Sequence, residues 1–222
     1  MEEGQRSGSV GRYGVLLATL IAAYLVSAVT TSRWGGPIHV AFVAAVGLLS
    51  LRNARLRPRV ARLAAAIVVV TAVAAGVGLS SDSKPAQGAG DVWGGVMLML
   101  TVLIIVYRVV QLDRVTAQSL YGALSAYLLI GMMFSEYFAA LSVLAPEPFF
   151  ADGQTANTQT LQYFSFATLT TLGYGDFTAA GSLGRAIAVL EAISGQVFLA
   201  TLVARLVSAY EGSGRRRPPR DG

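Results

Sequence analysis

The sequence contains no cysteine, a single histidine and few charged residues. Without thiols, the chain can form neither disulfides nor a zinc–thiolate site. Charged residues make up 13% of the 222 residues, against about 25% in an average soluble protein. His39 starts an apolar run and is expected to be an interfacial residue rather than a pH sensor. With 54% hydrophobic residues and a mean hydropathy of +0.58, the composition predicts an integral membrane protein.

Lysine is nearly absent too, since Lys84 is the only one among 17 basic residues. This preference for arginine, together with much alanine and glycine, suggests a GC-rich bacterial genome. The net charge of +5 could suit a nucleic-acid partner. However, the arginines lie in short loops between hydrophobic runs, where membrane orientation explains them better. We therefore expect a bacterial inner-membrane protein with no nucleic-acid partner.

Hydrophobic runs fill most of the chain, and an apolar helix of about 20 residues is enough to cross a membrane. The second of these runs, residues 38–51, can span the membrane only if the turn at Trp34–Pro37 enters the interface. The first run, residues 13–32, could instead be a cleaved signal peptide. However, it is long for the apolar core of a signal peptide, and no clear cleavage site of the small-x-small type follows it. Residues 82–91 are predicted to form a polar turn. The six runs are residues 13–32, 38–51, 63–81, 92–107, 119–144 and 183–210.

The basic residues are divided unequally between the two sides of such a six-helix chain. With the amino terminus in the cytoplasm, 14 of the 17 lie inside, as the positive-inside rule requires. Only Arg33, Lys84 and Arg185 fall outside. Both tails, residues 1–12 and 211–222, are then expected to be cytoplasmic.

A short motif lies between the last two runs: Thr171-Leu172-Gly173-Tyr174-Gly175-Asp176. It resembles the selectivity filter of the potassium-channel superfamily, where backbone carbonyls replace the hydration shell of the ion. To aim consecutive carbonyls at one axis, the backbone must alternate in handedness, and left-handed angles are cheap only for glycine. Gly173 and Gly175 have the required spacing, and the Thr171 hydroxyl can add an oxygen. The resemblance implies that the permeant ion K⁺ binds Thr171, Leu172, Gly173 and Tyr174.

Residues around the motif are expected to support it. The resemblance implies that the Tyr174 ring points away from the ion and props the loop open, and that Gly175 completes the filter. Asp176 would raise the cation concentration at the mouth. Some bacterial family members carry a pore-helix glutamate that pairs with this aspartate, but Ala167 stands there. We therefore expect Tyr163 to brace Asp176 instead.

The order of elements resembles the pore domain of prokaryotic potassium channels with one pore loop per chain. The resemblance implies an all-α fold of six transmembrane helices plus a re-entrant pore helix and filter. Since one chain supplies a quarter of the filter, a homotetramer in membrane lipid is expected, without a soluble partner. The pore domain would cover 113–210, after a four-helix peripheral membrane domain at 13–112. Its parts would be an outer helix (119–144), a pore helix (158–170), the filter (171–175) and an inner helix (183–210).

The inner helix carries further candidates. Gly195 falls at the family's gating-hinge position, although it could equally serve close helix packing. By the same alignment, Gln196, Leu199 and Val203 would line the cavity below the filter. Glu191 is a carboxylate within a membrane helix, where an unpaired charge is expensive. It is expected to hydrogen-bond the pore-helix hydroxyls of Ser165, Thr168 or Thr170 and to brace the filter, or else to serve packing only.

The sequence thus predicts a channel that conducts K⁺ passively, and not an enzyme. A less selective cation channel and a non-conducting membrane subunit with a vestigial filter are the alternatives. A secondary transporter is disfavoured because no inverted repeat of hydrophobic segments is evident.

Opening of this channel is expected to depend at most weakly on voltage. Moving one charge across 100 mV is worth about 2.3 kcal/mol, and steep gating needs several per subunit. The fourth run, residues 92–107, contains no arginine, and Arg108 follows it. Conductance measured against voltage in planar bilayers should therefore rise gradually, and a curve that requires several gating charges per subunit would contradict the prediction.

Overall fold

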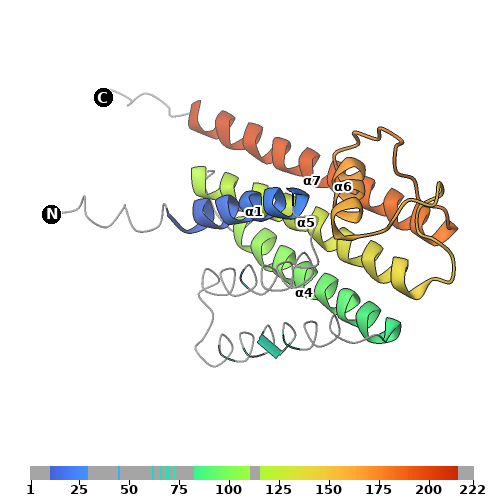
Figure 1. Ribbon diagram of the computed structural model, residues 1–222. Helices are drawn as coiled ribbons and strands as arrows, with labels where there is room; N and C mark the ends of the chain where they lie inside the picture. Colours follow the sequence, from blue (N-terminus) through green and yellow to red (C-terminus); the bar gives the residue numbers. More distant parts are fainter. Residues whose placement is uncertain are drawn as a thin grey trace, which may run out of the picture.

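The computed structural model describes residues 11–29, 83–110 and 116–214, with single positions between 45 and 73. The regular secondary structure of the described part is helical, apart from one isolated β-bridge, and loops precede and follow α6 (Figure 1). The predicted runs at 38–51 and 63–81, His39 and most of both tails lie outside the continuously described residues. The helices are α1 (Gly11–Val29), α4 (Lys84–Val110), α5 (Ala117–Leu144), α6 (Thr158–Leu169) and α7 (Ser182–Gly214).

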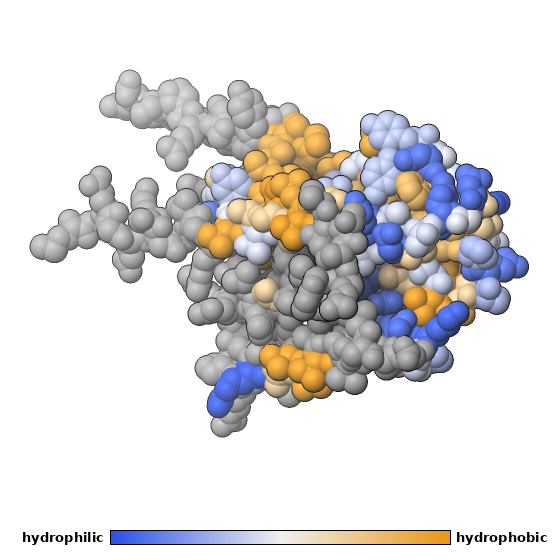
Figure 2. Space-filling model, in the orientation of Figure 1, coloured by the Kyte–Doolittle hydropathy of each residue, from blue (hydrophilic) through white to orange (hydrophobic). Residues whose placement is uncertain are grey.

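Three of the described helices contain stretches long and apolar enough to cross a membrane: Lys84–Tyr107, Ala117–Leu144 and Ser182–Ser208. The apolar part of α1, Tyr13–Ala28, is shorter. Among the coloured residues, hydrophobic side chains gather in patches over the helices, whereas hydrophilic ones gather at the end that carries the loops around α6 (Figure 2). This distribution suits helices in lipid with the α6 loops at an aqueous boundary.

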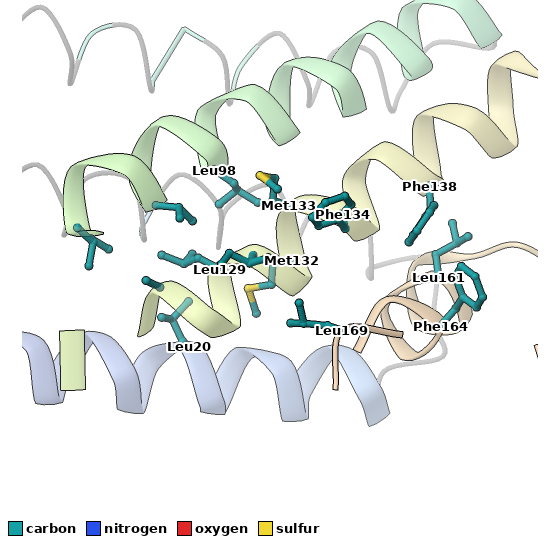
Figure 3. Packing of buried hydrophobic residues seen from close by; sticks show 14 of the residues in the cluster. Leu20, Leu98, Leu129, Met132, Met133, Phe134, Phe138, Leu161, Phe164 and Leu169 are labelled. Atoms are coloured by element: carbon teal, nitrogen blue, oxygen red, sulfur yellow. The ribbon is translucent and has the colours of Figure 1, made fainter. Parts of the chain in front are cut away.

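Helix α5 is the element on which the others pack, since α1, α4, α6 and α7 all contact it. It lies between α4 and α1, with Leu98 and Leu20 directed toward it (Figure 3). Its own Leu129 and Phe138 are fully buried. The outer helix predicted at 119–144 is therefore the centre of the described fold.

The polar turn predicted at residues 82–91 is wrong, because α4 already begins at Lys84. Pro85 is tolerated there because the first turn of a helix needs no amide donor. Gly88 of the predicted turn and Gly94, which follows it, lie where α4 approaches α5 closely. A Cβ on Gly88 would lie 2.5 Å from Leu144 Cγ, and one on Gly94 would lie 3.2 Å from Glu136 Oε2. Close helix packing thus offsets the helix-propensity cost of glycine, about 1 kcal/mol each.

Helix α6 is short and begins at a strong cap. The Asn157 side chain accepts a hydrogen bond from the Thr160 amide at 2.9 Å, and the Thr160 hydroxyl accepts one from the Asn157 amide. Further along, the β-bridge between Phe150 and Ala179 ties the segment before α6 to the segment after the filter motif. These two constraints fix both ends of the loop that contains α6.

Helix α1 also contacts α6. Ser27 Oγ donates to Gln162 Oε1 at 2.5 Å, and Gln159 Nε2 donates to the Ala28 carbonyl at 2.5 Å. The rings of Tyr24 and Phe166 lie 4.7 Å apart. The first hydrophobic run, which sequence reasoning placed in a peripheral domain, therefore packs directly against the predicted pore helix.

Ser27→Ala is expected to weaken this contact. Gln162 is only 2% exposed, so the loss of its donor should destabilise the fold by about 0.5–1.5 kcal/mol. Thr19→Ala is the matched control, since Thr19 donates only to the Val15 carbonyl of its own helix. Thermal unfolding in detergent should show a lower midpoint for Ser27→Ala alone, and equal midpoints would contradict the contact.

Candidate functional site

The motif at residues 171–175 begins where α6 ends. Thr170 caps α6, and its amide donates to the Phe166 carbonyl. The amides of Leu172 and Gly173 then both donate to the Ala167 carbonyl, at 2.8 and 3.2 Å. The last turn of α6 therefore engages the amides of the motif.

The backbone of the motif alternates in handedness, as the sequence predicted. The angle φ is positive at every second residue: 57° at Thr171, 55° at Gly173 and 80° at Gly175. Among the residues that the structure describes, no hydrogen bond ends on the carbonyls of residues 171 to 174. Four consecutive backbone oxygens are thus available to a ligand.

Thr171 is a strained position that sequence reasoning missed. A left-handed conformation costs about 1–2 kcal/mol in a residue with a Cβ. Its hydroxyl donates to the Thr170 carbonyl at 2.7 Å, while the lone pairs of this oxygen can still accept or bind a cation. The signal was present in the sequence, because Thr171 continues the spacing of two set by Gly173 and Gly175.

The motif is exposed in the single chain. Leu172 is 53% exposed and Tyr174 is 70% exposed. A cavity of about 520 Å³ lies behind the loop, between α6 and the start of α7, and its walls include Tyr163, Ala167 and Tyr174. A single chain therefore leaves both faces of the motif uncovered.

Asp176 has the partner that the sequence predicted. The Tyr163 hydroxyl donates to Asp176 Oδ2 at 2.9 Å. This hydrogen bond raises the pKa of Tyr163, since ionisation would remove the donated proton and place two negative charges together. Gln154, which sequence reasoning missed, donates to the Asp176 carbonyl at 2.7 Å. Asp176 is thereby tied to α6 and to the segment before it.

Glu191 also contacts α6. Its side chain is fully buried, and Oε1 lies 2.5 Å from Ser165 Oγ. Of the three hydroxyls expected as partners, Ser165 makes the contact, while Thr170 donates to Phe166 of its own helix. The structure thus brings together Glu191 of α7 and Ser165 of α6, as the bracing hypothesis expected.

Gly195 packs against the end of α6. A Cβ at this position would lie 2.5 Å from the Leu169 carbonyl oxygen and 2.8 Å from Leu169 Cδ1. Of the predicted cavity residues, Gln196 and Val203 are exposed and Leu199 is half-buried. The close approach favours a packing role for this glycine, beside the hinge role that the resemblance implies.

Gly195→Ala separates these two roles. The added Cβ should force α7 away from α6 and destabilise the fold by about 1–3 kcal/mol. If the glycine were only a hinge, alanine would instead stabilise the helix by up to about 1 kcal/mol. Thermal unfolding in detergent measures the sign, with the neighbouring Ser194→Ala as control because Ser194 bonds only its own helix.

Comparison with known proteins identifies one part of the chain. Residues 122–211 match the model of a family described as "Ion channel", and this segment contains α6, the motif and most of α5 and α7. No curated protein and no solved structure matches the chain. Within the described residues, no cluster of acidic or histidine side chains could hold a metal ion. The chain thus contains an ion channel domain in membrane-type helices, which supports passive conduction of ions.

Proposed function

We propose that this protein is a potassium-selective channel and that four copies surround one pore. The observation that carries the proposal is the motif backbone, with alternating handedness and four carbonyls without partners in the described chain. A partly dehydrated K⁺ requires several oxygens around it, and a ring of carbonyls supplies them without placing a fixed charge on the pathway. One chain provides such oxygens from one side only.

The elements around the motif have matching roles in this proposal. Helix α6 directs its negative dipole end toward the space below the motif, which favours a cation there. Asp176, held by Tyr163, places a carboxylate beside the outer end of the motif and raises the local cation concentration. Tyr174 is 70% exposed in one chain and would pack against a neighbouring copy. The exposed loop residues thus form the subunit contact.

The same proposal sets the orientation in the membrane. The motif faces outward and both termini face the cytoplasm, in accord with the distribution of basic residues. Gln196, Leu199 and Val203 then line the inner cavity, and Gly195 permits α7 to bend there. The protein would lie in the bacterial inner membrane.

Ion flux from liposomes that contain the purified protein tests this function. A K⁺ gradient should drive flux, whereas an equal Na⁺ gradient should not. Flux of both ions would identify a less selective cation channel. No flux of either ion, from protein shown to be tetrameric, would identify a non-conducting subunit.

Gly173→Ala is expected to abolish or degrade K⁺ selectivity. The alanine must adopt φ near 55°, which costs about 1–2 kcal/mol, or rotate and turn its carbonyl away from the ion. Gly153→Ala is a matched control, since Gly153 also has positive φ (71°) and open space around it but lies outside the motif. The K⁺/Na⁺ flux ratio should fall only in Gly173→Ala. A parental ratio in that variant would disprove the filter assignment.

A further inference from the structure

One buried hydroxyl connects three helices behind the motif. Ser165 of α6 is fully buried, and its Oγ lies 2.6 Å from the Gly131 carbonyl of α5 and 2.5 Å from Glu191 Oε1 of α7. The approach of α5 depends on Gly131, since a Cβ there would lie 2.9 Å from the Phe166 ring. These three polar groups meet beside the helix whose last turn holds the amides of the filter motif.

The two short contacts of Ser165 Oγ, with the Gly131 carbonyl and with Glu191 Oε1, require two protons. A backbone carbonyl can only accept, so the single Ser165 proton must be donated to Gly131. One hydroxyl proton cannot also serve Glu191 Oε1 at 2.5 Å in another direction. A carboxylate would therefore face the lone pairs of the serine oxygen without a proton between them. A protonated Glu191 supplies the missing proton, and the chain then runs from Glu191 O–H to Ser165 O–H to the Gly131 carbonyl.

The surroundings of Glu191 favour the same state. Its Oε2 is buried and has no hydrogen-bond partner among the described residues, which a neutral carbonyl tolerates far better than an ionised oxygen. No ion pair to Glu191 is present in the described part of the chain. The titratable neighbour is Tyr127 of α5, whose hydroxyl donates to the Leu169 carbonyl. The hydrogen-bond partner from α6 is the uncharged Ser165.

We infer that Glu191 is a protonated positioning residue that holds α6, and with it the filter motif, between α5 and α7. Loss of the proton would replace a donor by a negative charge at the buried serine and break the connection of α7 to α6. Because the carbonyl of Ala167 on α6 binds the amides of Leu172 and Gly173, displacement of α6 displaces the motif. The effect on conduction rests on the proposed channel function, whereas the effect on stability does not.

Stability measured against pH tests this inference directly. The folded chain retains a proton that an exposed glutamate releases above about pH 5, so stability should fall as pH rises. Between pH 6 and 9, the folding equilibrium constant of the parent should fall by up to about tenfold per pH unit per subunit relative to Glu191→Gln. The glutamine amide donates to Ser165 at any pH, so it should preserve the fold without this dependence. Glu147→Gln, which removes an exposed loop carboxyl, should keep the parental dependence.

Two further measurements exclude a purely structural role. Infrared difference spectra of parent minus Glu191→Gln should contain the band of a protonated carboxyl at neutral pH. Ser165→Ala removes the acceptor and should lower the melting temperature of the parent more than that of Glu191→Leu, which has already lost the donor. Equal pH dependence in parent and Glu191→Gln, or absence of the protonated band, would overturn the inference.

Flux completes the test. K⁺ flux of the parent should decline at the pH where the folded protein loses the Glu191 proton, which is where its stability stops falling relative to Glu191→Gln. The flux of Glu191→Gln should stay constant. If the parent conducts at no pH, the proposed channel function fails, and the melting and infrared results still decide the state of Glu191. Parental melting and flux in Glu191→Leu would show that the carboxyl positions nothing.

Discussion

A row of backbone carbonyls can bind an ion only when the chain itself leaves those oxygens without hydrogen bonds. In this protein no hydrogen bond among the described residues ends on the carbonyls of residues 171 to 174, while the Ala167 carbonyl in the last turn of α6 accepts the amides of Leu172 and Gly173. The left-handed angles at Thr171, Gly173 and Gly175 then keep consecutive carbonyls from alternating sides. The strained conformation of Thr171 is supported by its own hydrogen bonds, from its amide to the Thr168 carbonyl and from its hydroxyl to the Thr170 carbonyl.

Helix α6 is held by polar contacts from three sides. Ser27 of α1 reaches Gln162, Gly131 of α5 accepts from Ser165, and Glu191 of α7 contacts the same serine. In an apolar environment each of these groups would be costly without its partner. The same contacts therefore position α6 as well as stabilise it. Since α1 lies outside the segment that matches the ion channel family, part of this support comes from a helix that the family model does not cover.

Glycine has two different uses in this chain. At Gly173 and Gly175 it permits a backbone conformation, whereas at Gly88, Gly131 and Gly195 it permits close approach of two helices. Sequence reasoning recognised the first use from the spacing. It misjudged the second at residues 82–91, where a cluster of glycines with a proline was interpreted as a turn. Local composition cannot distinguish the two cases, because close approach depends on a partner distant in sequence.

The sequence by itself determined the membrane class, the outer, pore and inner helices of the ion channel domain, and the alternating backbone of the motif. These follow from the length of the apolar runs, the conformational freedom of glycine and the resemblance of the motif to a selectivity filter. Only the tertiary structure decided that α4 begins at Lys84, that α1 packs against α6, and that Gly195 lies against Leu169. It also selected Ser165 from the three hydroxyls expected as partners of Glu191, and it added Gly131, which lies 60 positions before Glu191. Such contacts depend on how separate helices approach one another, and no local pattern encodes that.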